Sequence, residues 1–534
     1  MRRNKFHLCL ISLIILSFCF GMIGCKRKIS IPEKGHLRIH LGTEPPSLDP
    51  TLTDSVVSFK IIENILEGLV EYDEQLNLRP AGAHSWTVSS DGRTYTFLLK
   101  DNVWTDGKPV TADDFIFALQ RALSPITPSV AVPLLFSITG AADFKYSRTA
   151  DWNRVGVRAL NPKSLQIELA YPEPSFLHVL AQPITFPQRR DIVQPMGERA
   201  WLDPEKMVTN GPFRLAAWKH DSRIELLRNN LYVGDSPSLE RITALIVSET
   251  RTALTLYEGG EIDILEQMPP FALREYKRSS ELKIYPDFST YFVAFNTRKA
   301  PFDDVRVRKA FVMSINKSAI VNIVDGGVKP AKSFVPPGIV GFNPAIGLFP
   351  NYKGANSLLA AAGFDPRQDG KSFPQIIAGF NTNERHQLIM EWLQQQWKDI
   401  LKIRVSLDNR EWKSYLDWLV SDPPHIFRYA WLAAIPDAIA HLTLFESTNP
   451  SNFGKWSNGH YDQLISKIRR TPPSAERSLL IDEAQRILVE QEAVLIPIYF
   501  YTRPILSKPY VRGLRVTGRG VLPYKSVSIQ TGRP

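Results

Sequence analysis

The chain has 534 residues, of which 44% are hydrophobic and 22% are charged. This composition is ordinary for a globular protein, and the length is too great for one small core, so we expect two or three domains. The net charge is +10. The cations are interspersed with acids along the chain, which argues against a nucleic-acid-binding protein.

The amino-terminal segment predicts export and a lipid anchor. A basic start, MRRNKFH, precedes a mostly apolar run of 13 residues from Leu8 to Phe20. The run is shorter than the roughly 20 residues that span a bilayer, and the pattern is typical of a secretory signal peptide. The segment after this run ends in Met22-Ile-Gly-Cys25, which resembles a bacterial lipobox. We expect residues 1–24 to be the signal peptide and Cys25 to be lipidated, the alternative being an ordinary signal with an incidental cysteine.

Cysteine content agrees with lipidation. The chain has three cysteines, and cleavage before Cys25 would remove Cys9 and Cys19. The mature chain would then carry one cysteine and could form no internal disulfide. We expect residues 25–36 to be a tether whose acyl chains hold the protein on a membrane and whose cations face anionic headgroups.

Periodic segments alternate along the mature chain and predict a mixed α/β protein. The expected elements are a strand at 37–41, a helix at 55–70, a hairpin turn at 91–92, a strand at 93–100, two strands after residue 209, a strand at 291–295 and helices near 354–363, 384–399 and 475–491. Thr111 followed by Asp114 predicts a helix N-cap, and Asp304 stands at another helix start.

Sequence patterns of hydrolytic enzymes are absent. The chain contains no His-Glu-x-x-His, no Gly-x-Ser-x-Gly, no phosphate-binding loop and, after cleavage, no cysteine nucleophile. We therefore expect no catalytic residue, no metal and no cofactor. A surface hydrolase is kept as a less favoured alternative to a binding protein.

Seven segments together resemble one family. They are SLDP, ENILEGL, VWTDGKPVTADDF, TNGPFRL, KAPFDDVRVRKAF, AGFDP and AVLIPIYFY. They occur in the order of that family and cover residues from about 37 to 515. The chain is thereby identified as a member of the peptide- and oligopeptide-binding proteins of ABC importers, the family 5 type of large extracellular solute-binding proteins, here as a bacterial lipoprotein.

The resemblance implies an α/β fold with two lobes, a ligand cleft between them and an extra domain inserted in the first lobe. The lobes of such proteins close on the ligand by a hinge motion. The implied divisions are 37–72 for the first part of lobe I, 73–203 for the extra domain, 204–286 for the second part of lobe I, 287–500 for lobe II and 501–534 for the carboxyl-terminal part of lobe I.

The resemblance also implies ligand-binding residues. SLDPTLTDSVV matches a loop whose backbone pairs with the peptide, RYAWLAAIPDAIAHL matches a conserved Arg-x-Gly-Trp loop, and FNTNERH matches a loop that supplies a histidine. The segment TPSVAVPLL, residues 127–135, stands where other members cover the ligand with aromatic residues. The implied substrate-binding residues are Asp54, Ser55, Val56, Asn210, His386, Arg428, Ala430, Trp431, Leu432, Ala434 and Asp437.

Ala434 departs from the family pattern. Members carry an aspartate there, which holds the ammonium of the ligand, and a buried ammonium without a partner costs roughly 3–5 kcal/mol. Either Asp437 substitutes for that aspartate, or the ligand lacks a conventional free amino terminus. A structural role for Asp437 is the alternative. The loss favours the further hypothesis of a cell-wall peptide fragment or another capped or non-peptide solute.

The function implied is a lipid-anchored component of an ABC importer that captures oligopeptides and delivers them to a permease. The expected partners are a peptide-like ligand, the permease and ATPase subunits of the inner membrane, and the membrane itself through the lipid. We expect a monomer that binds no nucleic acid. The expected location is the cell envelope, in the periplasm or on the outer face of the cell membrane.

Overall fold

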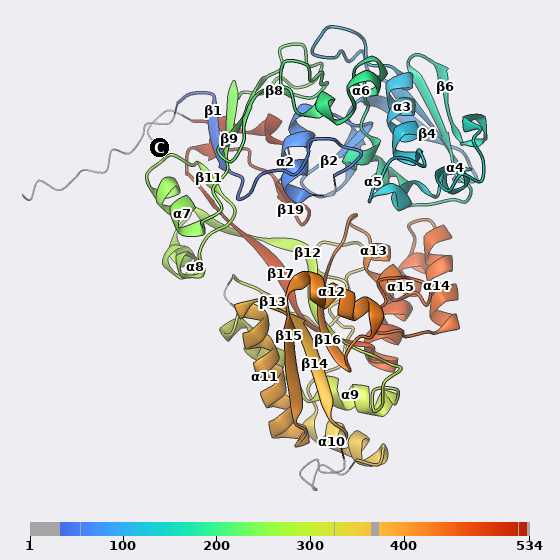
Figure 1. Cartoon of the computed structure of the whole chain (residues 1–534), viewed down its shortest axis with the longest axis vertical. Helices are drawn as coiled ribbons and strands as arrows, with labels where there is room; N and C mark the ends of the chain where they lie inside the picture. Colours follow the sequence, from blue (N-terminus) through green and yellow to red (C-terminus); the bar gives the residue numbers. More distant parts are fainter. Residues whose placement is uncertain (1–32, 54, 325, 365–372, 522, 531–534) are drawn as a thin grey trace, which may run out of the picture.

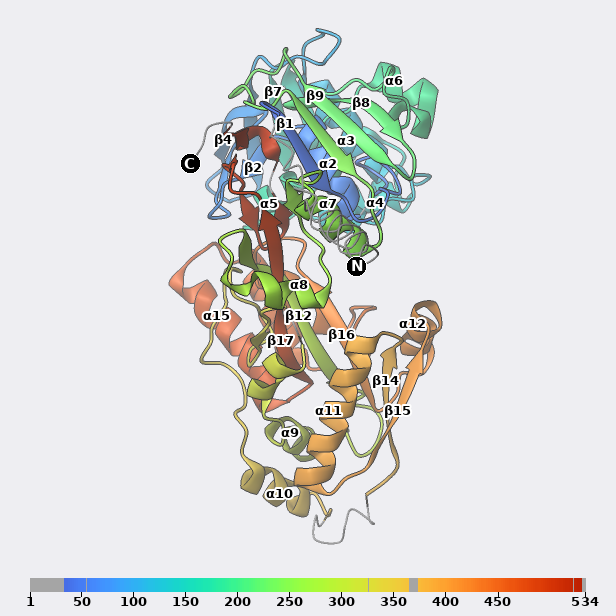
Figure 2. The same ribbon diagram turned by 90° about the vertical axis from the view of Figure 1, so that its left-hand side faces the viewer.

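The computed structural model describes residues 33–53, 55–324, 326–364, 373–521 and 523–530. The chain forms two lobes joined by two long strands, β12 (Leu282–Phe295) and β17 (Leu495–Ser507). The two strands pair with each other in antiparallel fashion, and Figure 2 shows them again running from one lobe into the other. The two-lobed α/β architecture expected from the sequence is present.

One large sheet runs through both lobes. Its 11 strands follow the order β15-β14-β16-β12-β17-β11-β1-β10-β9-β8, with β13 paired to β17 outside that path. The strands of lobe I are β1 (His36–His40), β8 (Phe213–Lys219), β9 (Arg223–Arg228), β10 (Arg241–Leu245) and β11 (Ile264–Leu265). The strands of lobe II are β13 (Lys329–Pro330), β14 (Ile376–Asn381), β15 (Val405–Arg410) and β16 (Ile426–Leu432).

The ladder between β12 and β17 is irregular where the strands leave one lobe for the other. Pro286 pairs with Thr502, and the next pair is Thr290 with Phe500, so the register shifts between them. A bulge of this kind disrupts the ladder locally and increases its twist. It therefore provides a point at which the two strands can bend together.

The extra domain lies beside lobe I and is built on a second sheet of order β4-β5-β7-β6. Its strands are β4 (Ala83–Val88), β5 (Thr94–Leu99), β6 (Val157–Asn161) and β7 (Ser164–Glu168). Phe97 and Phe115 of this domain belong to the same buried hydrophobic cluster as Leu37 and Ile61 of lobe I. The extra domain thus shares its core with lobe I.

Helices flank both sheets. They are α2 (Val56–Ile65), α3 (Ala112–Leu123), α4 (Ala141–Lys145), α5 (Phe176–Leu180), α6 (Arg190–Met196), α7 (Thr250–Glu258), α8 (Pro270–Glu275), α9 (Val305–Met313), α10 (Tyr352–Ala361), α11 (Glu384–Leu401), α12 (Trp412–Ser421), α13 (Ile439–Leu442), α14 (Gly459–Arg470) and α15 (Ala475–Arg486). The remaining short strands are β2 (Val70–Tyr72), β3 (Leu78–Pro80), β18 (Val511–Arg512), β19 (Val516–Thr517), β20 (Gly520–Val521) and β21 (Ser528–Ile529).

The predicted helix starts are confirmed, but one predicted helix is too long. Asp114 accepts from Thr111 in a capping box at the start of α3, and Asp304 caps α9 by accepting from the backbone N–H of Arg306. The helix expected over 55–70 ends at Ile65. The reason is that the Asn210 amide bonds both the N–H and the carbonyl of Glu67 at 3.0 Å, which removes these groups from the helical hydrogen-bond pattern.

Lobe II buries apolar side chains on both faces of its part of the large sheet. Phe292 of β12 belongs to one cluster, together with Tyr415 and Ile465. The next residue, Val293, belongs to another cluster that contains Trp397. Successive side chains of a strand point to opposite faces, so the sheet of lobe II is covered on both sides.

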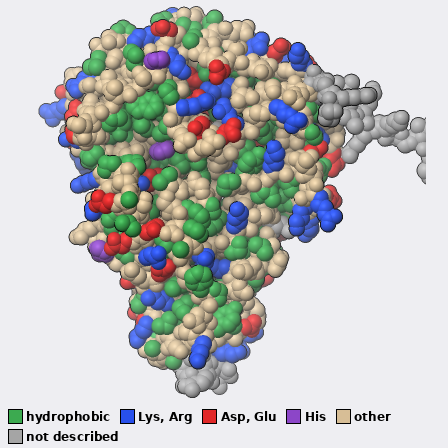
Figure 3. Space-filling model, turned by 180° about the vertical axis from the view of Figure 1, so that it is seen from behind, with side chains coloured by type: hydrophobic (Ala, Val, Ile, Leu, Met, Phe, Trp, Pro, Cys, Tyr) green, Lys and Arg blue, Asp and Glu red, His purple; other side chains and the backbone are tan. Residues whose placement is uncertain are grey.

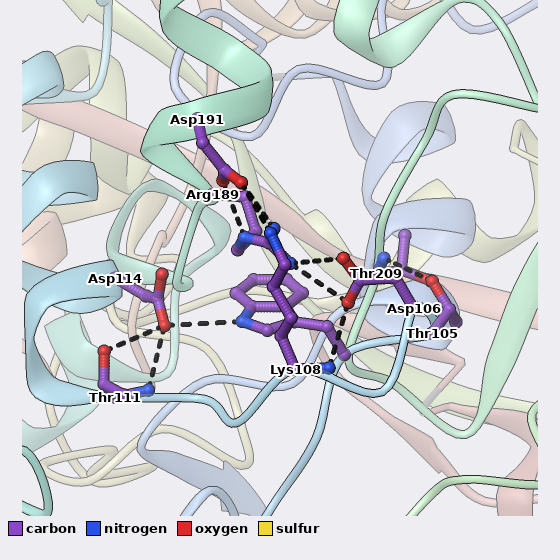
Figure 4. A network of polar contacts seen from close by, with 9 residues as sticks. Thr105, Asp106, Lys108, Thr111, Asp114, Arg189, Asp191 and Thr209 are labelled. Atoms are coloured by element: carbon purple, nitrogen blue, oxygen red, sulfur yellow. Dashed lines mark hydrogen bonds and ion pairs between the residues drawn. The ribbon is translucent and has the colours of Figure 1, made fainter.

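A polar network in the extra domain fixes the VWTDGKPVTADDF segment (Figure 4). Trp104 is buried in the core, and its indole Nε1 donates to Asp114 at 3.3 Å. Arg189 bonds both oxygens of Asp106, at 3.0 and 2.8 Å, and both oxygens of Asp191, at 2.8 and 2.7 Å. These hydrogen bonds hold the pKa of Asp191 well below its usual range. This segment, one of the seven that carry the resemblance, is therefore structural.

The face shown in Figure 3 carries charged side chains of both signs. On the face in Figure 3, Lys and Arg side chains lie among Asp and Glu side chains. Across the described ranges, no helix is both long enough and apolar enough to cross a membrane.

Candidate functional site

A cavity of about 500 Å³ opens between the lobes. Its wall combines residues of α2, residues 130, 131, 133, 134 and 182–184 of the extra domain, residues 431–434 of lobe II and residues 517, 519 and 520 near the carboxyl terminus. These segments are far apart in the sequence and meet only in the folded chain. The volume is typical of ligand pockets, which measure roughly 300–1,000 Å³. We call this space the interlobe cavity.

Most side chains around the interlobe cavity are apolar. They include Val56, Phe59, Val130, Leu134, Ile184 and Leu432. Trp431 also lines the cavity, and its indole Nε1 donates to the carbonyl oxygen of Ala440 at 2.6 Å. That hydrogen bond fixes the orientation of the ring, so the cavity presents a preformed apolar wall on the lobe II side.

Charged groups at the interlobe cavity have partners. Arg519 donates to Glu63 at 3.3 Å and to the Gln182 side chain at 3.0 Å. Burial raises the pKa of Glu63 although Arg519 is adjacent. Lys60 forms an ion pair with Glu266 at 2.8 Å. Gln182 also donates to the carbonyl oxygen of Ala434 at 3.4 Å, which links the extra domain to lobe II across the cavity.

Asp437 is already occupied by protein groups. Its Oδ1 accepts from Arg477 at 2.9 Å and from the backbone N–H of Ile439 at 2.9 Å, at the start of α13. The Asp437 side chain is 9% exposed and that of Arg477 is 4% exposed. This arrangement favours the structural role for Asp437 over a role as ammonium partner.

A second group of polar residues surrounds Arg428 on β16. Its guanidinium donates to Asn381 at 3.1 Å and to the Tyr501 hydroxyl at 3.2 Å, and it lies 4.7 Å from the centre of the Tyr291 ring. Arg428 is 6% exposed. Within the part of the chain that the structure describes, no carboxylate lies within ion-pair distance of it. A buried cation without an anion is unfavourable, so the group is suited to receive one.

His386 belongs to the same group. Its ring centre lies 5.6 Å from that of Tyr291, and its Nδ1 has no hydrogen-bond partner among the described residues. Burial, together with the positive charges of Arg428 and Arg385, lowers the pKa of His386 to about 3. The imidazole is therefore neutral at pH 7 and can donate or accept one hydrogen bond. We refer to Arg428, His386, Asn381, Tyr291 and Tyr501 as the Arg428 cluster.

The edge of β16 is open beside the Arg428 cluster. β12 pairs with β16 along its whole length, from Ile426 to Leu432. On the other side, β14 pairs only with Ile426 and Phe427. In the described ladder, β16 therefore has no strand beside it on the β14 side from Arg428 onward. The carbonyl oxygen of Arg428 accepts from the Tyr415 hydroxyl at 2.6 Å, so the edge available to a ligand starts after that carbonyl. An open strand edge of this kind can accept an extended peptide as an added strand.

Comparison with known proteins identifies the family. A family model described as bacterial extracellular solute-binding proteins, family 5, matches residues 77–453. The chain belongs to this family. The oligopeptide-binding protein OppA of Bacillus subtilis (strain 168) is 32% identical over 537 residues, covering 97% of this chain and 98% of that protein.

Solved structures of similar proteins agree with the family 5 assignment. The unliganded open form of the periplasmic murein tripeptide binding protein MppA has a TM-score of 0.81 at 29% identity, covering 93% of this chain and 98% of that chain. The Haemophilus influenzae OppA complex with RPPGFSPFR has a TM-score of 0.74 at 28% identity, covering 94% of this chain and 100% of that chain. Solute binding is the role of family 5, and by its description the family is extracellular.

Several residues expected from the family 5 resemblance meet at the site. Val56, Trp431, Leu432 and Ala434 line the interlobe cavity. Arg428 and His386 lie in the Arg428 cluster, and Ala430 lies on the open-edged part of β16, paired with Tyr291 of β12.

Asn210, by contrast, lines neither the interlobe cavity nor the Arg428 cluster. Asn210 is 1% exposed and uses its amide on the backbone of Glu67, so we no longer retain it as a ligand residue. Ser55 is the N-cap residue of α2. Asp54 and Cys25 lie outside the described residues.

Sequence reasoning missed several polar residues of the interlobe cavity, among them Glu63, Gln182 and Arg519. Glu63 sits within a helical pattern, and Gln182 and Arg519 belong to segments with no motif. Their charge or polarity is ordinary for surface positions, and only the fold brings them together. The segment 127–135 did carry a signal, because the resemblance implied that it stands beside the ligand.

Proposed function

We propose that this family 5 protein captures oligopeptides in the interlobe cleft and delivers them to the permease and ATPase of an ABC importer. The observation that carries the proposal is the open edge of β16 next to a buried arginine that lacks an acid. The first feature suits a peptide backbone and the second suits a terminal carboxylate. The peptide-binding relatives of the chain, which match it over nearly its whole length, support the same function.

The ligand would lie along β16 with its carboxylate at the Arg428 cluster. Arg428, Ala430 and Leu432 point to the same face of the strand because side chains alternate. Leu432 is four residues from Arg428, about 13 Å at roughly 3.3 Å per residue. Since Leu432 lines the interlobe cavity, a peptide of about four residues would place its amino end in that cavity.

Binding would be accompanied by closure of the lobes. Residues 287–500 would move as lobe II against the segments 37–72, 204–286 and 501–534 of lobe I and the extra domain, 73–203. The register shift between Pro286 and Thr290 supports this division because it falls where both connecting strands leave lobe I. Closure would bring Val56 and Ser55 of lobe I against the ligand backbone held by lobe II.

The protein would act as a monomer without catalysis, held at the cell envelope by a lipid on Cys25. The sequence supports the anchor through its Met22-Ile-Gly-Cys25 motif. No group of three or more His, Cys, Asp or Glu side chains in the described part of the chain is arranged to hold a metal ion.

The test is calorimetry on the lipid-free mature domain, unfolded and refolded to remove carried ligand. The tetrapeptide Ala-Leu-Gly-Ala, N-acetylated, is titrated as the free acid and as the carboxyl-terminal amide. We expect the free acid to bind at least tenfold more tightly, since a charge-assisted hydrogen bond contributes about 1.5–3 kcal/mol. Arg428→Gln should abolish the difference, whereas Arg404→Gln, at an exposed arginine of lobe II, should preserve it. Equal binding of acid and amide to the wild type would contradict the proposal.

A further inference from the structure

The interlobe cavity lacks a free anion for a ligand ammonium. Its acidic lining residue, Glu63, is bonded to Arg519, and Glu266 is paired with Lys60. The nearest acid of the lobe II loop, Asp437, is bonded to Arg477. Within the described residues every carboxylate around the cavity thus has a cationic partner. An ammonium placed there would lose its hydration without gaining a counter-ion.

Besides these paired charges, neutral polar groups face the interlobe cavity between the lobes. The Gln182 side chain donates to the carbonyl oxygen of Ala434, and the Ala434 side chain is exposed on the cavity wall. A carboxamide and a backbone carbonyl are matched to another amide rather than to a charge. They can exchange their mutual hydrogen bond for bonds to an amide group of a ligand.

The rest of the wall is suited to a hydrocarbon group. Val130 and Leu134 of the extra domain face the cavity together with Phe59 of α2 and Leu432 of β16. Val130 is 65% exposed and Leu432 is 43% exposed, so burying these side chains against a ligand is favourable. The cavity of about 500 Å³ leaves room for a group much larger than a methyl.

From these observations we infer that the preferred ligands are short peptides whose amino end is blocked as an amide by an apolar acyl group, and that this group occupies the interlobe cavity. The inference rests on the proposed function, because the Arg428 cluster and the β16 edge determine that the amino end lies in the cavity. It goes further by naming the ligand class: an uncharged, acylated amino end together with a free carboxylate.

The experiment titrates three forms of Ala-Leu-Gly-Ala, all free acids, into the stripped wild-type domain. The forms carry a free amine, an N-acetyl group and an N-hexanoyl group. We expect the N-acetyl form to bind at least tenfold more tightly than the free amine, and the N-hexanoyl form more tightly still. Equal or tighter binding of the free amine would overturn the inference while leaving peptide capture intact. Binding of none of the three would overturn both the inference and the proposed function.

Two variants at one position isolate the effect of charge. Ala434→Asp introduces a carboxylate on the exposed wall, and Ala434→Asn adds the same volume without charge. We expect Ala434→Asp to shift the preference toward the free amine by at least tenfold relative to wild type, and Ala434→Asn to leave the acylated forms preferred. An equal shift in both variants would assign the effect to volume and would overturn the inference.

Discussion

Two buried arginines of lobe II, Arg477 and Arg428, differ in what surrounds them. Arg477 lies on α15, is 3% exposed, and has the carboxylate of Asp437 at 2.9 Å. Arg428 lies on β16, is 6% exposed, and contacts an amide, a hydroxyl and an aromatic ring. Both side chains have lost most of their hydration, but only Arg477 has an anion to compensate for it.

The difference separates a structural cation from one available to ligand. Asp437 holds Arg477 and accepts from the N–H of Ile439, the first residue of α13, and the network around Arg189 in the extra domain follows the same principle with two acids. Such pairs fix the chain where they stand. The Arg428 cluster has the same burial but keeps a positive charge unmatched, and electrostatic attraction for a carboxylate is strong in a site of low polarity. Burial of a cation therefore indicates a binding site only where the acid is missing.

The largest expected effect on the free energy of unfolding comes from removing the carboxylate beside Arg477, which leaves this arginine without an acid, as Arg428 is. Asp437→Ala leaves Arg477 buried without an acid, and breaking a buried pair in this way costs about 3–5 kcal/mol. Urea unfolding of the mature domain measures the loss. Asp437→Asn keeps an oxygen for the Ile439 N–H and should lose less than Asp437→Ala. A loss below about 1 kcal/mol for Asp437→Ala would show that the pair does not stabilise the fold.

Acid pH tests a second buried group of lobe II, His441, which is fully buried and packs edge-on against Phe334 at 5.1 Å. Burial lowers its pKa from the ordinary 6.5 to about 3. The unfolded chain therefore binds a proton that the folded chain does not, and stability present above pH 6.5 is lost as the pH falls toward 3. Between pH 6 and pH 5, protonation of this histidine in the unfolded chain should lower the free energy of unfolding by about 1 kcal/mol.

Urea unfolding of His441→Leu at pH 6 and at pH 5 should show a shallower pH dependence of the unfolding free energy than wild type, by about one proton.

His386 has an equally low pKa of about 3 and should contribute to the pH dependence in the same direction. Addition of a peptide carboxylate should weaken the contribution of His386, because the anion favours its protonated form, and should leave that of His441 unchanged. If His441→Leu kept the pH dependence of the wild type, the lowered pKa of His441 would be contradicted.

The smallest effect on stability is expected at Arg428. Replacing a buried ion by an apolar side chain of similar length is often neutral or stabilising, so Arg428→Met should change the unfolding free energy by less than about 1 kcal/mol. The change is measured in urea alongside Asp437→Ala. Destabilisation of Arg428→Met by 3 kcal/mol or more would mean that Arg428 is structural, and the contrast between the two arginines would fail.

Local signals in the sequence predicted local structure well. The N-cap residues Thr111 and Asp304 were identified from a few neighbouring residues. The helix after Ser55 was predicted too long, because its end depends on Asn210, which is distant in the sequence. Tertiary contacts of this kind override helical periodicity.

The site was predicted only in part for a related reason. Trp431, Leu432 and Arg428 lie on one motif-bearing strand, so family resemblance located them. Gln182 and Arg519 reach the cavity from two other segments, and a single sequence contains no signal that joins them. The resemblance also raised the question of whether Asp437 binds ligand, and only the position of Arg477 gives a physical argument against it.

The double connection between the lobes has a consequence for how the chain matures. Ile264 of β11 pairs with Ser507 of β17, and β17 also pairs with β12 in lobe II. A ribosome delivers β17 among the last elements, so neither lobe can complete its sheet until the carboxyl-terminal strand has emerged. Long-range pairings of this kind form slowly and expose unpaired edges meanwhile. A truncation before Leu495 would therefore leave both halves of the protein unfinished.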